Sequence, residues 1–232
     1  MAILRLNGDV VDNEWGEIYD YYGIDCITPK KTAVALAELA DGDTLHIKLN
    51  SGGGHVMAGQ EIYALLRDRD DVDIEVESLA ASAASVIAMA APCKMLPTAL
   101  LMVHRAWISS SGNKNDLERD ARALSAVDEA LSAAYSEKSG MSKEDALALM
   151  DAETWLTAER AVELGLVDGI SKRASKKAAA SAGLAVTDDM VAEYKRAMAE
   201  RKATKEREDA ELKALLDDLK KTAEPKGDEA HE

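Results

Sequence analysis

Residues 77–91 read ESLAASAASVIAMAA and follow a strand-like stretch of the chain. They place one serine, Ser82, among small residues at the point where a strand is expected to turn into a helix. Such a turn can present a hydroxyl nucleophile, because small neighbours let a substrate backbone approach and the first helical N–H groups are free to bind an oxyanion. Small residues also serve close helix packing, so further segments are needed to decide between the two interpretations.

An upstream segment, residues 46–56, reads HIKLNSGGGHV, an alternating strand that breaks into three glycines. Helical spacing follows from Ala58 to Leu66, so the sequence predicts a strand, a glycine loop and a helix. Glycine permits positive φ and close backbone approach, which suits N–H donors aimed at a carbonyl oxygen. The loop lacks the Gly-Lys-Ser/Thr ending of a phosphate-binding loop and the spacing of a dinucleotide fingerprint. An ordinary turn is the remaining alternative.

Two downstream segments supply an imidazole and two carboxylates. The apolar run of residues 100–103 ends in His104, and an imidazole at the tip of a buried strand can reach a nucleophile on a neighbouring element. Residues 150–168 read MDAETWLTAERAVELGLVD and place Asp151 and Glu153 just before an apolar pair. Either carboxylate could orient the histidine. The structural alternatives are a packed histidine and solvated acids.

Together these segments resemble the ClpP family of serine peptidases, over residues 3–172 and in the family's order. Residues 50–54 are similar to its Asn-Ser-Pro-Gly-Gly loop, with Gly52 in place of proline, and residues 80–82 to its Ala-Ala-Ser turn. Residues 96–104 are similar to its Leu-Pro and Met-Ile-His segment, and residues 155–168 to the ending after the triad acid. The combination is most similar to the ClpP-type head maturation (prohead) proteases of tailed phages and prophages.

The resemblance implies a catalytic role for each matching position. Ser82 would be the nucleophile and His104 the general base, since serine attacks only as a base removes its proton. The backbone N–H groups of Gly54 and Ala83 would form the oxyanion hole. The alignment favours Ser82 over Ser85, which lies one helical turn further on and is interpreted as a packing residue.

The third member of the triad departs from the family pattern. The family's aspartate falls on Glu153, whose side chain is one methylene longer. A triad acid holds the imidazole tautomer and stabilises the imidazolium, which a glutamate can also do. We expect Glu153 to be the acid, and Asp151 remains the alternative.

The resemblance also implies an α/β fold, the ClpP/crotonase-like arrangement of repeated ββα units. Residues 115–139 have amphipathic helical spacing and would form a protruding handle through which subunits pair in a ring. We expect a serine protease domain over residues 1–172 and a charged linker with a helical or partly disordered tail over residues 173–232. Within that tail, an apolar stripe at helical spacing is formed by Leu212, Leu215, Leu216 and Leu219. It is interpreted either as part of a solvated helix or as a docking segment. The aromatic stretch from Trp15 to Tyr22 is expected to pack in the core.

Composition narrows the class of protein. The chain has 232 residues and a net charge of −15, which argues against a nucleic-acid-binding surface. No apolar run approaches a membrane span. Two cysteines, Cys26 and Cys93, are too few for a disulfide framework, so we expect a reducing compartment. This compartment would be the cytoplasm, which is the host cytoplasm if the protein is encoded by a phage. The histidines make no zinc spacing. We expect no cofactor and no metal.

We therefore expect a serine endopeptidase that cleaves capsid or scaffold proteins during phage head maturation and assembles as a homo-oligomeric ring. A cellular ClpP-like proteolytic subunit working with a separate ATP-dependent unfoldase is the nearest alternative. A crotonase-like acyl-CoA enzyme would use the same fold and paired N–H groups without needing Ser82 and His104. An inactive structural ring, with activity lost through the change at Glu153, is a further alternative.

Overall fold

The computed structural model describes residues 2–172 and residue 196. The first of these ranges contains every strand and helix described below. The bounds are β1 Ala2–Asn7, β2 Asp9–Val10, α1 Asn13–Tyr21, β3 Cys26–Ile27, α2 Pro29–Ala37, β4 Leu45–Ser51, α3 Val56–Leu66, β5 Val72–Ala81, α4 Ala83–Ala88, β6 Cys93–Met95, β7 Leu100–Val103, α5 Lys114–Ser139, α6 Lys143–Asp151, β8 Thr154–Thr157, α7 Ala158–Glu163 and β9 Gly169–Ile170. The predicted apolar stripe of the tail lies outside the described residues.

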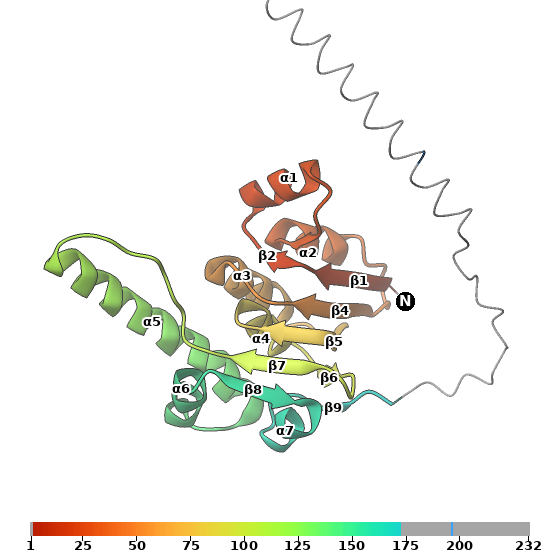
Figure 1. The fold of residues 1–232 in the computed structure, drawn as a ribbon. Coiled ribbons are helices and arrows are strands. Elements are labelled where there is room, and N and C mark those ends of the chain that lie inside the picture. The colour runs from red at the N-terminus through yellow and green to blue at the C-terminus, as the bar shows by residue number, and fades with distance from the viewer. Residues whose placement is uncertain (1, 173–195, 197–232) are drawn as a thin grey trace, which may run out of the picture. The chain divides into compact units, whose positions relative to one another are not determined.

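The main sheet is mostly parallel and has β4 and β5 at its centre. Its order is β1-β4-β5-β6-β9, and β7 pairs with both β5 and β8. Only the pairing of β7 with β8 is antiparallel in this sheet, as far as the described residues show. Figure 1 shows β1, β4, β5, β7 and β8 side by side, in this order. The predicted mixed α/β class is confirmed.

Strand β5 changes its neighbour part-way along, and this change positions the candidate site. Residues Ile74–Val76 pair with β6, whereas Leu79–Ala81 pair with β7. The far end of β5 therefore runs beside β7, with Ala81 opposite Met102. Because parallel strands end at the same edge of a sheet, the residues that follow β5 and β7 meet there.

Local sequence explains the helices on either side of the glycine loop. Helix α2 begins with Pro29 in its first turn, behind Thr28, whose hydroxyl accepts the N–H of Lys31. Helix α3 begins after the glycines at Val56, where the His55 ring accepts the N–H of Ala58. The strand, glycine loop and helix predicted from residues 46–66 are thus confirmed.

Helix α5 is long and anchored at one end only. Asn113 and Asp116 form a reciprocal capping box at its start, and Gly140 ends it in the left-handed conformation. Its buried residues all lie in the second half, from Asp128 to Tyr135. Figure 1 shows the first half extending away from the sheet. The predicted helix is confirmed, whereas its role as a subunit-pairing handle stays a prediction.

The core lies between the sheet and the helices packed on it. Its largest fully buried side chains are Ile27, Leu45, Ile47, Leu49, Ile62, Leu66, Ile74, Ile87, Met95, Leu101, Met150 and Leu166. The aromatic residues of α1 do not join them: Trp15 is 56 % exposed and Tyr21 is 76 % exposed. The interpretation of this stretch as core was wrong, because the buried residue of α1 is Gly16, which lies against Thr28 at the start of α2.

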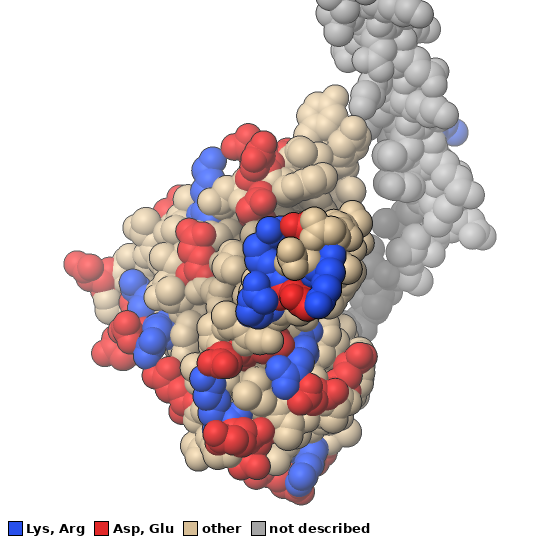
Figure 2. Space-filling model, turned by 90° about the vertical axis from the view of Figure 1, so that its left-hand side faces the viewer, with Lys and Arg blue, Asp and Glu red and all other residues tan. Residues whose placement is uncertain are grey.

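Charged side chains of both signs mix on the surface from which α5 extends, as Figure 2 shows. Ion pairs there join Lys114 to Glu118 and Arg119 to Asp116 within the first turns of α5. Exposed pairs of this kind contribute little to stability and are screened by salt. Among the described residues, no helix is long and apolar enough to cross a lipid bilayer.

Candidate active site

Ser82 occupies the sharp turn between β5 and α4. Its backbone has φ 55° and ψ −126°, a conformation that L-residues rarely adopt and that costs about 1–3 kcal/mol. The turn is held from behind, because the Ser82 N–H donates to the carbonyl of Met102 on β7 over 3.0 Å. A strained strand-to-helix turn of this type presents its hydroxyl to solvent at the edge of the sheet, as a nucleophile requires.

His104 directly follows β7 and contacts this hydroxyl. The His104 Nε2 atom lies 2.7 Å from Ser82 Oγ, within hydrogen-bond distance. The contact follows from the register of β5 and β7, which places Ala81 opposite Met102. An imidazole at this distance can take the hydroxyl proton as the oxygen attacks, which is the geometry of a general base.

The glycine loop closes the other side of the same site. Gly53 accepts the N–H of Val10 over 2.8 Å, and its backbone has φ 97°. A Cβ at this position would lie 2.7 Å from Ser82 Cβ and 3.1 Å from the backbone N of Ala83. Gly54, with φ 142°, has no room either, since its Cβ would lie 2.2 Å from the Val10 carbonyl oxygen. The close approach of this loop to the serine turn therefore needs glycine.

These elements border a cavity of about 440 Å³. It is lined by Asp9, Gly52, Gly53, Gly54, Val56, Ser82, Met102, His104, Ala106 and Trp107. Apolar walls beside a hydroxyl, an imidazole and a glycine-rich backbone suit an extended peptide. The family resemblance predicts Gly54 as an oxyanion-hole donor; of the loop's glycines, Gly53 makes the closest approach to Ser82.

The candidate acids lie just before β8, the strand that pairs with β7: Asp151 ends α6, and Glu153 lies in the turn that precedes β8. Val103 is opposite Thr154 in the antiparallel pairing of β7 and β8, so the next residues outward are His104 and Glu153. Glu153 has φ 46° and an exposed side chain. Within residues 2–172, His104 forms no hydrogen bond with Glu153 or with Asp151. The structure thus brings Ser82 and His104 together, and neither candidate acid contacts the His104 ring among the described residues.

Asp151 is bound elsewhere, in an ion-pair cluster centred on Arg105. The Arg105 guanidinium donates to both Asp151 oxygens and, over 3.1 Å, to Asp128 Oδ2 on α5. Hydrogen bonds with Arg105 lower the pKa of Asp151, and the two carboxylates raise the pKa of Arg105. Asp128 is 3 % exposed and also accepts the N–H of Ala106 over 2.8 Å. This cluster ties α5 to the residues that follow His104.

Ser85 faces away from the cavity. It is fully buried, and its Oγ donates to the Ser82 carbonyl over 2.6 Å while lying 2.8 Å from the Tyr135 hydroxyl. Burial raises the pKa of Tyr135 to about 12, so this phenol stays neutral. The interaction joins α4 to α5 and gives Ser85 a structural role.

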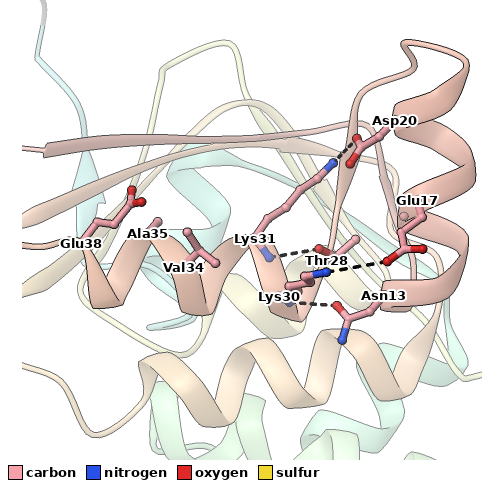
Figure 3. A pocket seen from close by; sticks show the side chains of 10 residues that line it. Asn13, Glu17, Asp20, Thr28, Lys30, Lys31, Val34, Ala35 and Glu38 are labelled. Carbon is pink, nitrogen blue, oxygen red and sulfur yellow. Dashed lines mark hydrogen bonds and ion pairs between the residues drawn. The ribbon is translucent and has the colours of Figure 1, made fainter.

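A second cavity, of about 350 Å³, lies between α1 and α2 (Figure 3). Lys31 donates to Asp20 across it over 2.6 Å, and the N–H of Lys30 donates to the Asn13 side chain over 2.9 Å. It shares no lining residue with the cavity at Ser82. In the described part of the chain, no group of three or more His, Cys, Asp or Glu side chains could hold a metal ion.

A family model described as Clp protease matches residues 28–174, more than half of the chain. The chain belongs to the Clp protease family. Members of this family are serine peptidases that act on proteins and form oligomeric rings. The match favours peptidase chemistry over the crotonase-like acyl-CoA alternative.

Individual Clp proteases are similar to this chain over most of the described residues. One is the ATP-dependent Clp protease proteolytic subunit 1 of Chlamydia muridarum, 29 % identical over 70 % of this chain and 91 % of the relative. Another is the ATP-dependent Clp protease proteolytic subunit 3 of Rhizobium etli, 33 % identical over 59 % of this chain and 72 % of the relative. The corresponding subunit of Bacteroides fragilis is 32 % identical over 56 % of this chain and 64 % of the relative.

Sequence reasoning missed the Arg105 cluster and the carboxylate of Asp9 in the cavity wall. A signal for the cluster exists in the sequence, because Asp128 interrupts the apolar face of α5 between Val127 and Leu131. A carboxylate on a buried helix face needs a charged or N–H partner. No comparable signal marks Asp9, whose position depends on the packing of β2 against the glycine loop.

Proposed function

We propose that this chain is a serine endopeptidase in which Ser82 is the nucleophile and His104 the general base. The observation that carries the proposal is the 2.7 Å contact between His104 Nε2 and Ser82 Oγ at the rim of a peptide-sized cavity. Ser82 Oγ attacks the peptide carbonyl while its proton passes to His104 Nε2. The imidazolium then gives that proton to the leaving amine, and water repeats the sequence on the acyl-enzyme.

We place the oxyanion in the space between the glycine loop and the first turn of α4. The backbone N–H groups of Gly54 and Ala83 are the proposed donors, as in the family pattern. The N–H of Ala83 lies in the first turn of a helix, where N–H groups have no intrahelical acceptor. Preplaced donors at the developing negative charge supply the largest single contribution to such catalysis.

Glu153 is the proposed orienting acid. It directly precedes Thr154, which pairs with Val103, so it is the next residue outward beside His104, whereas the Asp151 carboxylate is occupied by Arg105. A side-chain rotation of the exposed Glu153 would bring its carboxylate to the free ring nitrogen of His104. Assembly or substrate binding can supply the contacts that fix this rotation, since catalytic hydrogen bonds often tighten only in the complex.

We propose that the biological role is head maturation in a tailed phage or prophage, with capsid or scaffold proteins as substrates. Residues 80–85, which read AASAAS, and residues 153–158, which read ETWLTA, support this role through their resemblance to the phage proteases. In this proposal residues 1–172 form the protease domain, residues 173–232 a separate tail, and the free half of α5 a handle that pairs subunits in the ring. The similar proteins named as ATP-dependent proteolytic subunits favour the second candidate, a partner of a Clp ATPase.

The experiment incubates the purified full chain with the capsid and scaffold proteins encoded beside its gene, with and without ATP and a Clp ATPase. Head maturation predicts defined cleavage without ATP that is absent in Ser82→Ala. Cleavage that needs the ATPase and ATP identifies the second candidate. No Ser82-dependent cleavage of these proteins or of unfolded casein under any condition would overturn the peptidase assignment itself.

A further inference from the structure

One carboxylate, that of Asp9, lines the cavity that contains Ser82 and His104. Apart from Ser82 and His104, the other side chains on the cavity wall are apolar, from Val56, Met102, Ala106 and Trp107, and no lysine or arginine is among its lining residues. Asp9 forms no ion pair within residues 2–172. The cavity next to the reacting hydroxyl thus carries a negative charge that the described part of the chain does not neutralise.

The backbone of Asp9 is fixed relative to the candidate nucleophile. Strand β2 pairs with β3, and its second residue, Val10, donates to the Gly53 carbonyl and accepts the N–H of His55 over 2.7 Å. Gly53 in turn lies against Ser82. Two short strands and the glycine loop therefore hold Asp9 at a set position beside the serine turn.

The side chain of Asp9 is oriented by helix α1. The Tyr19 hydroxyl donates to Asp9 Oδ2 over 2.9 Å, and this hydrogen bond raises the pKa of Tyr19, which keeps the phenol protonated as a donor. No other side-chain hydrogen bond to the Asp9 carboxylate is present among the described residues. An ionised carboxylate can accept several hydrogen bonds, so Oδ1 is available to a ligand.

We propose that Asp9 is a specificity-determining residue that favours peptides with an arginine or lysine side chain next to the cleaved bond. The proposal rests on the peptidase function proposed above. A long basic side chain suits both features of the cavity, because its methylene stem packs on apolar walls while its cationic end pairs with a carboxylate. Helix α1 then has a function at the site, since its Tyr19 positions the carboxylate that selects the substrate.

The test compares N-acetylated peptides that differ only in arginine or citrulline at the residue preceding the cleaved bond, and a second set that varies the residue after it. Citrulline keeps the shape and removes the charge. For one of the two sets we expect kcat/KM to be about tenfold higher with arginine than with citrulline. This ratio lies between the effect expected of a fully exposed charge pair and that expected of a buried, hydrogen-bonded one. The preference falls as ionic strength rises, because added salt screens the pair.

Asp9→Asn removes the charge and keeps an acceptor for Tyr19, so the arginine-to-citrulline ratio of kcat/KM should fall to about one. Asp68→Asn, just beyond the C-cap of α3, makes the same change of charge and should leave the ratio intact. Tyr19→Phe should reduce the ratio in part. An unchanged ratio in Asp9→Asn, or an equal loss in Asp68→Asn, overturns the assignment of Asp9. Cleavage of citrulline peptides in those same assays leaves the peptidase proposal standing.

Discussion

Replacing Asp128 with alanine should destabilise the fold and slow catalysis together. The substitution removes the acceptor of the Ala106 N–H, at 2.8 Å, and one partner of Arg105, at 3.1 Å. The Ala106 N–H is partly buried, and leaving it without an acceptor costs about 1–3 kcal/mol. The Arg105 contribution is smaller, about 0.2–1 kcal/mol, because its side chain is 38 % exposed and retains Asp151. The expected total loss in the free energy of unfolding is about 1–4 kcal/mol.

Asp151→Ala is the matched control for Asp128→Ala. It also removes a carboxylate from Arg105, but the Asp151 side chain is 59 % exposed and no backbone N–H loses its acceptor. We expect a clearly smaller loss than in Asp128→Ala, because solvent screens an exposed ion pair. Urea unfolding followed by tryptophan fluorescence, at one fixed protein concentration, measures both values.

Activity should follow the same order. Arg105 and Ala106 directly follow His104 in the chain, so loosening them displaces the imidazole that contacts Ser82. We expect kcat to fall at least about tenfold in Asp128→Ala and less than about threefold in Asp151→Ala, since small misplacements of catalytic groups are costly. Equal losses of stability in the two variants would refute the reasoning, because burial would then not distinguish the two carboxylates.

Three further predictions concern the same core. Gly53→Ala should lower peptide cleavage about a hundredfold, because its Cβ would lie 2.6 Å from a backbone oxygen, whereas Gly52→Ala meets nothing within 4 Å and should be nearly neutral. Ser85→Ala should cost about 1–3 kcal/mol by leaving the buried Tyr135 hydroxyl without its partner, as thermal unfolding can check, while serine-directed labelling persists. Burial raises the pKa of Cys93 from 9.0 to about 12 and that of Tyr135 from 10.0 to about 12. Both groups therefore ionise in the unfolded chain at a lower pH than in the folded one. Their contribution to stability is fully present below pH 9 and is lost as the pH rises toward 12. Unfolding at several alkaline pH values should show this decline, and a flat profile would contradict it.

Local sequence was sufficient to predict the elements that carry the site. Alternating apolar and polar residues predicted β4, the three glycines predicted the loop, and helical spacing predicted α3. Small residues predicted the turn at Ser82. Each of these signals acts over a few neighbouring residues, as turn and helix preferences do. The resemblance to a family then supplied the pairing of Ser82 with His104, which no local pattern could provide.

The remaining features depend on non-local packing. The contact between His104 and Ser82 follows from the register that sets Ala81 opposite Met102, and β5 reaches that register only by leaving β6 part-way. The exposed aromatic residues of α1 were assigned to the core because hydrophobicity alone does not tell which face a short helix buries. Asp9 was missed for a related reason, since β2 is joined to the glycine loop by backbone hydrogen bonds that no side-chain pattern encodes.

Mapping the residue that reacts with a fluorophosphonate is the most direct test of the paired serine and histidine. The intact chain is treated with the probe, digested and examined by mass spectrometry, in parallel with Ser82→Ala, His104→Ala and Ser85→Ala. We predict a single adduct on Ser82 that persists in the Ser85 variant and disappears in the His104 variant. An adduct on another residue, or undiminished labelling of Ser82 without the imidazole, would contradict the assignment of these two residues as nucleophile and base.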